Sequence, residues 1–393
     1  MTAKTVAIFG ATGSVGQSAA DVIAAHPNRF SVTTVTAHAK AQALADTARR
    51  LNARRAVIAD EGQYTALRDA LAGSGIEVAA GRAALIDAAR ESVDLHMAAI
   101  SGMAGLEPLM AAIASAKSVA IANKEPLVAA GPLVMSAAAQ SGCKILPMDS
   151  EHNAIFQVLE EGSRDAVDKI ILTASGGPFR TASLEDMDAA TPERALKHPN
   201  WNMGAKISID SATMMNKALE VIEARYLFYM DPARIAVLIH PQSVIHSMVE
   251  YADGSVLAQL GAADMRTPIA YCLGWPERIA TPGRRLDWRN LGDLTFEDVD
   301  ERRFPAIKLA YECLDSGSGA CVALNAANEI AVAAYLDKRI PLTHITALAR
   351  DMAALGAGQG TLGGLDDILA FDAEIRAKTE SLIQHTLKPG KRA

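Results

Sequence analysis

The chain has 393 residues, a formal net charge of -7, and a composition that is 50% hydrophobic. This length exceeds what a single hydrophobic core usually supports, so we expect two or three domains. The acidic balance argues against a general nucleic-acid-binding protein, because the dense basic run is confined to the short tail at residues 388–392. Small-molecule chemistry is favoured.

Cysteine usage and the apolar segments indicate a cytoplasmic protein. The cysteines show no metal-binding spacing and are expected to be reduced; they are Cys143, Cys272, Cys313 and Cys321. The chain enters a strand pattern almost at once, without the features of an export signal. The most apolar window, residues 97–116, is interrupted by Glu107 and Pro108 and divides into strand, turn and helix, so we expect no membrane span.

The first part of the chain alternates apolar runs with alanine-rich helical patterns. A strand at residues 4–9 is followed by a glycine turn and a helix at residues 14–26. Further strands are predicted at residues 31–36, 55–59, 93–99, 118–122 and 144–148. This order predicts an α/β fold that begins with a Rossmann-like, doubly wound parallel sheet.

The glycine turn GATGSVG occupies residues 10–16, at the first strand-helix junction. Its glycines would allow a tight turn, close approach of the backbone to a pyrophosphate, and close packing of helix on strand. A purely structural turn is the alternative. The second strand ends in TAHAK without an acid to bind ribose hydroxyls, and His38 and Lys40 would tolerate a 2′-phosphate, which favours NADP over NAD.

The densest polar stretch is residues 198–220, HPNWNMGAKISIDSATMMNKALE. It predicts a strand at residues 206–209, then Asp210 and Ser211 capping a helix from residue 212. On that helix Asn216, Lys217 and Glu220 would share one face. Ser211 at its positive end suits a phosphate, and Glu220 could hold a cation. A capped amphipathic helix without chemistry is the alternative.

A second acidic pair follows the strand at residues 144–148. If the chain stays extended, Asp149 and Glu151 project to the same side. Together with Glu220 they would form an oxygen-only donor set, which favours Mg²⁺ or Mn²⁺ over zinc. A polar loop that caps a helix at residues 154–161 is the alternative.

The remainder predicts a central α+β catalytic domain and a C-terminal helical bundle. A strand at residues 168–173 leads into a glycine turn whose Ser175 hydroxyl could meet a phosphate. A segment containing Trp201, residues 191–204, is either a closing lid or an ordinary loop. Strands at residues 234–246 and 254–260 would complete a mixed sheet, and residues 319–338 form the clearest helix. The expected boundaries are 1–149, 150–281, a linker at 282–300, and 301–393.

Several long motifs carry a family resemblance. They are GATGSVG, ANKEPLV at 122–128, MDSEHNAIFQ at 148–157, TASGGPFR at 173–180, the 198–220 stretch, and HPQSVIHSMVE at 240–250. Nearly end to end, the chain resembles the 1-deoxy-D-xylulose-5-phosphate reductoisomerase family of the non-mevalonate isoprenoid pathway. The resemblance implies a homodimer that uses NADPH and Mg²⁺ or Mn²⁺ to rearrange and reduce this ketose phosphate to 2-C-methyl-D-erythritol 4-phosphate, with no nucleic-acid or membrane partner.

The resemblance also implies residue roles. Asp149, Glu151 and Glu220 would hold the metal and, with Lys124 and His198, form the catalytic set. Substrate contacts would come from Lys124, Ser150, Glu151, Ser175, His198, Trp201, Ser211, Asn216, Lys217, Glu220 and His246. The cofactor would meet Gly10, Thr12, Gly13, Ser14, Val15, Ala37, His38, Asn123, Glu125 and Gly204. TAHAK departs from the family, which often has glycine or alanine followed by asparagine here.

Two other classes share part of this pattern. A phosphorylating semialdehyde dehydrogenase would need a thiolate nucleophile, and Cys143 is the nearby cysteine. A noncatalytic NADP sensor would keep the glycine turn but would have no use for three carboxylates and a phosphate site. Metal-dependent turnover separates these classes.

Overall fold

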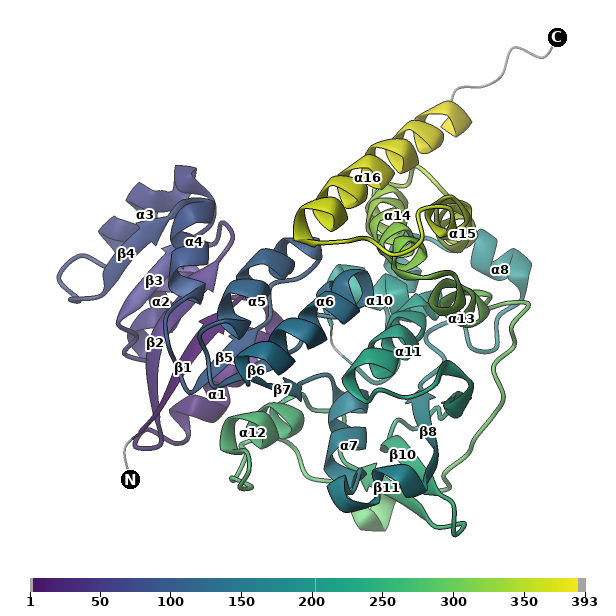
Figure 1. Ribbon diagram of the computed structural model, residues 1–393, viewed down its shortest axis with the longest axis horizontal. Coiled ribbons are helices and arrows are strands. Elements are labelled where there is room, and N and C mark those ends of the chain that lie inside the picture. Colours follow the sequence, from purple (N-terminus) through teal and green to yellow (C-terminus); the bar gives the residue numbers. More distant parts are fainter. Residues whose placement is uncertain (1–2, 202, 388–393) are drawn as a thin grey trace. The chain divides into compact units, whose positions relative to one another are not determined.

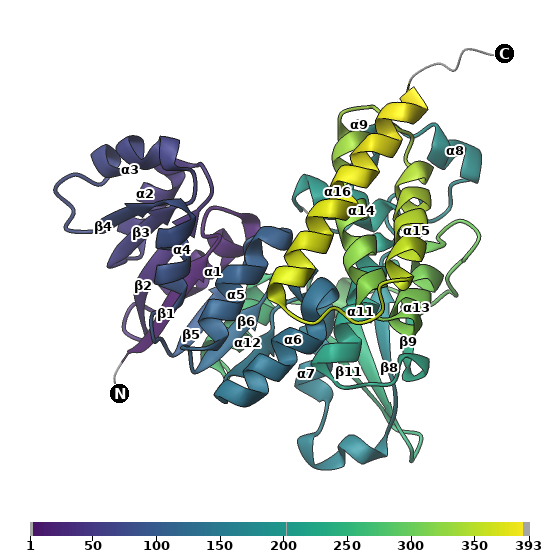
Figure 2. The ribbon, with the colours of Figure 1, turned by 45° about the horizontal axis from the view of Figure 1, so that its top comes forward.

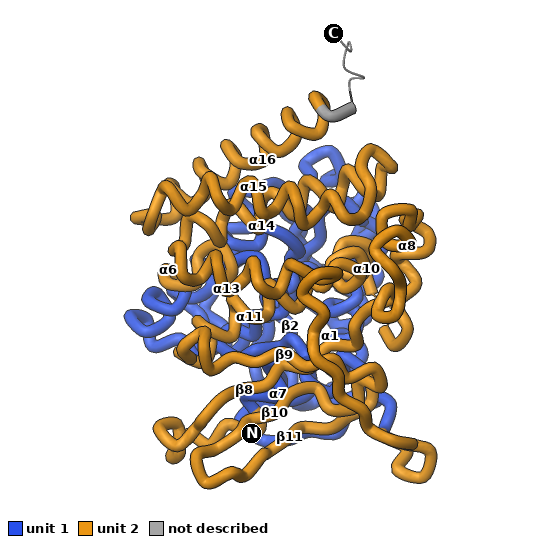
Figure 3. The backbone as a smooth tube through the Cα atoms, turned by 90° about the vertical axis from the view of Figure 1, so that its right-hand side faces the viewer, with its two compact units in different colours: residues 1–126, 134–156, 264–285 blue, residues 127–133, 157–263, 286–393 orange. Residues whose placement is uncertain are grey.

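The structure is a computed structural model that describes residues 3–201 and 203–387; the basic tail at 388–392 lies outside the described residues. The chain forms two compact units (Figure 3). Unit 1 comprises residues 1–126, 134–156 and 264–285, and unit 2 comprises residues 127–133, 157–263 and 286–393. The boundaries that the sequence predicts at residues 149, 281 and 300 remain predictions.

Unit 1 contains a seven-stranded sheet in the order β4-β3-β2-β1-β5-β6-β7 (Figure 1). Its neighbouring strands pair in parallel. The strands are β1 (Lys4–Phe9), β2 (Phe30–Ala37), β3 (Arg55–Ile58), β4 (Glu77–Ala80), β5 (Leu95–Ala98), β6 (Ser118–Ile121) and β7 (Lys144–Pro147). The doubly wound sheet is therefore confirmed. The sequence analysis missed β4, because this short edge strand is only partly buried and carries no apolar run.

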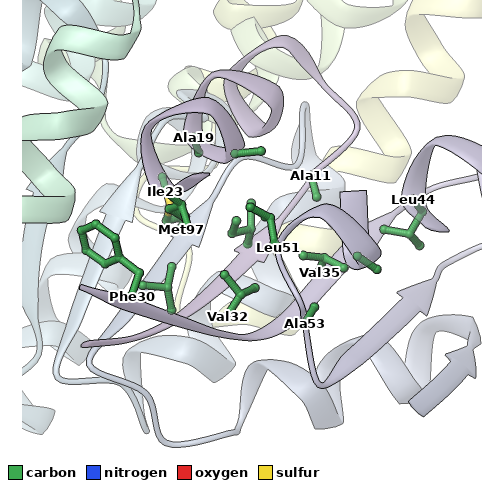
Figure 4. Close-up of a cluster of buried hydrophobic side chains, with 14 of the residues drawn as sticks. Ala11, Ala19, Ile23, Phe30, Val32, Val35, Leu44, Leu51, Ala53 and Met97 are labelled. Atoms are coloured by element: carbon green, nitrogen blue, oxygen red, sulfur yellow. The ribbon is translucent and has the colours of Figure 1, made fainter. Parts of the chain in front are cut away.

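Helices follow the strands and cover the sheet. They are α1 (Ser14–Ala24), α2 (Ala41–Arg50), α3 (Tyr64–Ala70), α4 (Gly81–Ala89), α5 (Leu106–Ile113), α6 (Glu125–Ser141), α7 (Ser150–Val158) and, much later in the chain, α12 (Arg266–Gly274). Buried side chains from α1, α2, α3 and α12 form one core with one face of the sheet, part of which Figure 4 shows. The apolar window at residues 97–116 divides into β5 and α5, as predicted.

The opposite face of β5 buries a histidine. Side chains alternate along a strand, so Leu95 and Met97 enter the core described above, and His96 points the other way. His96 is 1% exposed, and its ring lies 4.2 Å from that of Phe9, centroid to centroid. Its Nε2 has no hydrogen-bond partner among the described residues, and the side chain lines a cavity of about 10 Å³ that Asn123 also lines. That volume is close to the room one water needs.

The buried ring predicts acid sensitivity. Desolvation lowers the pKa of His96 from 6.5 to about 3. Below pH 6.5 His96 therefore binds a proton in the unfolded chain but not in the folded chain, so the free energy of unfolding falls as the pH falls. Between pH 7.5 and 5.5 the loss from this group is about 1.4 kcal/mol. We expect His96→Leu to lose less stability than the wild type over this interval, as measured by urea unfolding; equal losses would contradict the assignment.

Unit 2 contains a four-stranded mixed sheet in the order β11-β10-β8-β9. The strands are β8 (Val167–Ala174), β9 (Ile235–Ile239), β10 (Ile245–Tyr251) and β11 (Val256–Leu260); β8 and β9 are parallel and the other pairs antiparallel. The predicted single strand at residues 234–246 is wrong. It is interrupted by a turn in which Pro241 supplies no ladder donor and Ser243 has a φ of +49°.

The helices of unit 2 include a C-terminal group that surrounds α14. They are α8 (Leu184–Asp188), α9 (Pro192–Ala195), α10 (Ala205–Ala212), α11 (Met215–Leu227), α13 (Ala306–Ser316), α14 (Ser318–Leu336), α15 (Thr343–Ala357) and α16 (Leu365–Leu387). By length and composition α14 could cross a membrane, but 78% of its apolar window is buried. It packs against α13, α15 and α16 as a core helix (Figure 2), which confirms the helix predicted at residues 319–338.

Candidate functional site

The glycine turn of unit 1 joins β1 to α1, and two of its glycines are required by packing. Gly10 has a φ of +91°, and a side chain there would overlap the backbone of Ala99. A Cβ on Gly16 would overlap the Gly10 carbonyl and lie 2.6 Å from Ala11 Cα. A Cβ on Gly13, by contrast, would lie 3.4 Å from the Gly10 carbonyl oxygen, which is an ordinary van der Waals distance.

The N-terminus of α1 is open to an anion. Gly13 occupies the N-cap position without a side-chain cap, and Gly13 and Ser14 are exposed while Thr12 and Val15 are partly exposed. The first backbone N–H groups of a helix have no partner within the helix and carry partial positive charge. This end of α1 can therefore bind a phosphate or pyrophosphate through its backbone.

The end of β2 lies beside the glycine turn. Thr36 Oγ1 accepts a hydrogen bond from the Gly10 N–H at 3.1 Å, and Ala11 N–H donates to the Thr36 carbonyl. Ala37 is buried, whereas His38 and Lys40 are exposed. The residues that directly follow β2 therefore present basic or neutral side chains to solvent.

The start of α6 and the end of β7 carry a second polar group in unit 1. Asn123 is buried and its Nδ2 donates to the Gly102 carbonyl at 2.9 Å. Glu125 is buried in the first turn of α6. Lys124 is 6% exposed and its ammonium binds the carboxylate of Asp149. This buried ion pair links the ends of two neighbouring strands.

Asp149 and Glu151 do not lie on an extended segment, so that expectation is wrong. Helix α7 begins at Ser150, and Asp149 Oδ1 accepts a hydrogen bond from the Glu151 N–H at 3.1 Å, as a capping residue does. Ser150 Oγ donates to Glu151 Oε2 at 2.8 Å. Both carboxylates are partly buried. Helix capping, which the sequence analysis gave as the alternative, therefore occurs here, and Asp149 caps α7.

In unit 2, the turn after β8 pairs Ser175 with His198. His198 Nδ1 accepts backbone N–H groups from Asn200 at 3.2 Å and Trp201 at 2.9 Å, so the ring proton is on Nε2. Nε2 then donates to Ser175 Oγ at 2.9 Å, and Gly177 N–H donates to the same oxygen at 3.1 Å. Burial lowers the pKa of His198 to about 4. The Ser175 hydroxyl, which already accepts twice, can donate its hydrogen to an anion.

The predicted strand at residues 206–209 is wrong, because these residues lie in α10. The alternating ISI letters indicate a strand locally, but Ser208, Ile209 and Asp210 lie in a helix and are buried at consecutive positions, so more than one side of the helix is covered. Ser211 is consequently near the C-terminus of α10 and does not cap the next helix, where Met214 occupies the N-cap with a φ of +61°. Gly204, exposed, is the N-cap of α10.

Helix α11 does bring Asn216, Lys217 and Glu220 onto one face, as predicted. Asn216 Nδ2 donates to Glu220 Oε1 at 2.6 Å, and the Lys217 ammonium binds Glu220 Oε2. Glu220 is fully buried and Lys217 is 4% exposed. A carboxylate in this position is stable only because a cation and an amide donor compensate its lost hydration.

The predicted lid segment contacts the sheet of unit 2. The Trp201 ring lies 6.0 Å from that of His246, and Asn200 Nδ2 donates to the Pro241 carbonyl at 2.7 Å. Sequence analysis did not single out Asn200; its position next to Trp201 was the available signal. His240 is packed against Phe296 and hydrogen-bonded through both ring nitrogens, so it serves the fold.

Comparison with known proteins covers most of the chain. Family profiles of 1-deoxy-D-xylulose 5-phosphate reductoisomerase match residues 6–131 and, for two C-terminal domains, residues 145–228 and 260–378. The reductoisomerase of Zymomonas mobilis is 52% identical over 97% of this chain and 98% of its own length. That of Rhodospirillum centenum is 53% identical over 97% of this chain and 94% of its own. The chain belongs to the 1-deoxy-D-xylulose 5-phosphate reductoisomerase family.

Solved structures agree with this assignment. The Zymomonas mobilis reductoisomerase in complex with NADPH superposes with a TM-score of 0.92 at 50% identity, covering 98% of this chain and all of that one. A second reductoisomerase, in complex with NADPH, fosmidomycin and magnesium, has a TM-score of 0.94 at 42% identity and covers 99% of this chain and all of that one. The predicted fold class is therefore confirmed.

The cysteines do not support the dehydrogenase alternative. All four are buried. Burial raises the pKa of Cys143 to about 11 and that of Cys272 to about 12. A nucleophilic cysteine needs the opposite shift, because the thiolate is the reactive form. Membership of the reductoisomerase family and the burial of the four thiols both argue against an acyl-enzyme mechanism.

The glycine turn gives a stability prediction with an internal control. Gly16→Ala should destabilise the protein by about 1–3 kcal/mol, because the new methyl group overlaps rigid backbone. Gly13→Ala should cost less than about 1 kcal/mol, since the position is an exposed N-cap with room for a methyl group. Urea unfolding of both variants tests this; equal losses would contradict the packing role of Gly16.

Proposed function

We propose that this chain converts 1-deoxy-D-xylulose 5-phosphate to 2-C-methyl-D-erythritol 4-phosphate, using NADPH and a divalent cation. The observation that carries the proposal is family membership over nearly the whole length, together with a set of buried charged groups that a small acidic metabolite and a metal require. Cytoplasmic location and a homodimer are part of the same proposal and rest on the family resemblance.

The cofactor would bind to unit 1 at the glycine turn. The exposed, uncapped N-terminus of α1 suits the pyrophosphate, and residues Gly10, Thr12, Gly13, Ser14 and Val15 form its surroundings. Ala37 and His38 follow β2, Asn123 and Glu125 begin α6, and Gly204 of unit 2 completes the assigned set. NADPH would supply the hydride for the reduction. The chain's part is to hold and orient it.

Asp149, Glu151 and Glu220 are the proposed metal ligands. Asp149 and Glu151 of unit 1 and Glu220 of unit 2 each supply carboxylate oxygens. An acid-only donor set fits Mg²⁺ or Mn²⁺, and magnesium is present in a solved relative. A divalent ion at such a site acts as a Lewis acid on substrate oxygens. The ammonium groups of Lys124 and Lys217 lie against Asp149 and Glu220 and offset the hydration that these carboxylates lose on burial.

The substrate phosphate would bind in unit 2. The Ser175 hydroxyl is left to donate because His198 and Gly177 already donate to its oxygen. Ser211 lies against the same turn, since a Cβ on Gly177 would be 2.5 Å from the Ser211 carbonyl oxygen. Asn216 follows on α11. A phosphate beside His198 would also favour its protonation, which would add a charge-assisted bond.

Lys124, Ser150 and Lys217 are the remaining proposed contacts to the substrate's polar groups, and Trp201 with His246 would cover its carbon chain. In this arrangement residues 191–204 act as a lid that excludes water from the reacting atoms. The phosphate provides binding energy remote from the reacting carbons that helps to hold the lid closed.

The metal site is tested by Glu220→Gln, which keeps the size and removes the charge. We expect turnover to fall by roughly 100-fold, because a preorganised group that stabilises developing charge is lost. Added Mn²⁺ should recover part of the rate, and NADPH affinity without metal should stay unchanged. Glu223→Gln, also buried on α11, is the matched control. Full turnover of Glu220→Gln at limiting metal, or of the wild type in a chelator, would refute the metal assignment.

Cofactor choice is tested by steady-state kinetics with both nucleotides. Because His38 and Lys40 stand where an NAD site usually places an acid, NADPH should be preferred by about tenfold or more in kcat/KM, or about 1.4 kcal/mol. His38→Asp should shift the preference towards NADH by placing a carboxylate near the 2′-phosphate. His38→Asn, of equal size without the charge, is the control. Comparable efficiency of the wild type with both nucleotides would rule out the preference.

A further inference from the structure

Helix α10 carries a buried carboxylate that the proposed mechanism does not use. Asp210 is 1% exposed, although it is one residue from the proposed phosphate-binding Ser211. Its Oδ2 lies 2.9 Å from the ammonium of Lys206, on the preceding turn of the same helix. A carboxylate this deep requires further donors to compensate for lost hydration.

The second donor comes from the C-terminal helices. Asn328 Nδ2 donates to Asp210 Oδ1 at 2.9 Å, across 118 residues of sequence. Asn328 lies on α14 and is completely buried, and its own Oδ1 has no hydrogen-bond partner among the described residues. A buried amide with an unused acceptor is costly. The hydrogen bond that Asn328 donates to Asp210 therefore stabilises the structure against this cost.

Movement of α10 would reach the phosphate groups directly. Gly177, in the turn that holds Ser175, has a φ of +65°, and a Cβ there would lie 2.5 Å from the Ser211 carbonyl oxygen. The turn and the end of α10 therefore touch backbone to backbone, without a flexible side chain between them. A tightly packed contact of this kind transmits small displacements.

A second residue on the same face of α14 contacts the chain directly before residues 191–204. Tyr335 is two turns beyond Asn328, a spacing that places both side chains on one face. Tyr335 is 1% exposed, and its hydroxyl donates to the Ala190 carbonyl at 2.9 Å. Lys338 pairs with Glu193 nearby at 2.7 Å. Helix α14 thus contacts Ala190, directly before the segment, and Asp210, six residues after its end.

We propose that Asn328 is a positioning residue for the phosphate end of the substrate. It fixes α10 through Asp210 and thereby sets the position of Ser211 relative to Ser175, while Tyr335 fixes the entry to the segment. The C-terminal helices act on binding through α10 without touching the substrate. This inference rests on the proposed function for its substrate, whereas the Asn328 contact itself does not.

The test compares Asn328→Ala with Asn325→Ala. Asn325 is also fully buried on α14, one turn earlier, but its Nδ2 donates to Glu329 on the same helix at 3.1 Å. Both variants delete a buried amide, and only Asn328→Ala removes a contact with α10. We expect Asn328→Ala to raise the KM for the ketose phosphate and the inhibition constant of inorganic phosphate by about tenfold, the lower end of the range for a hydrogen bond to a charged group. The change in kcat should stay below about threefold, and NADPH affinity should not change.

Equal changes of KM and inhibition constant in the two variants, or none in a folded Asn328→Ala, would overturn the proposal. If Asn328→Ala does not fold, Asn328→Ser and Asn325→Ser give the same comparison with smaller losses of volume. Hydrogen exchange provides a readout that needs no substrate: amides of residues 205–212 should exchange faster in the Asn328 variant only. If the Asn328 variant shows the faster exchange but the wild type does not turn over the ketose phosphate, the contact between Asn328 and α10 stands and the proposed function is refuted.

Discussion

The burial of negative charge is the constraint on which this structure depends. Glu220 is fully buried and Asp149 is partly buried, and each has a buried lysine against it. An isolated carboxylate in such surroundings would take up a proton, and a protonated acid is a poor metal ligand. The lysines therefore offset the hydration that these two carboxylates lose. The ends of two neighbouring strands supply one of these pairs, and one turn of a single helix supplies the other.

The two pairs satisfy the constraint in different ways. Lys217 and Asn216 reach Glu220 through helix spacing of three and four residues, so α11 forms this group by itself. Lys124 reaches Asp149 only because β6 and β7 are neighbours in the sheet. The first arrangement is already present in the sequence, and the second exists only after the strands have paired. Asp210 is a third case, in which an amide from a distant helix supplies the donor.

This difference also explains what could be predicted from the sequence. Apart from β4, the strands of unit 1 can be predicted from apolar runs, and the face formed by Asn216, Lys217 and Glu220 follows from helix spacing. The sequence of residues 206–209 predicts a strand because its polar and apolar residues alternate. These residues form a helix instead because packing against distant parts of the chain overrides the local pattern. Asp149 was placed on an extended segment because its capping of α7 competes with continuation of β7. Asn328 lies in an apolar helix whose sequence indicates only a bundle element.

The path of the chain between the two units has a consequence for its synthesis. Unit 1 is assembled from three segments, and the last of them, residues 264–285, contains α12. Ile269, Ala270, Cys272 and Leu273 of this helix belong to the same core as α1 and β1. A ribosome-bound chain that ends before α12 therefore carries an incomplete nucleotide-binding fold with an apolar surface open to water. The core on β1 is therefore completed only after residues 264–285 have been synthesised. Unit 1 cannot finish folding before much of unit 2 has been made.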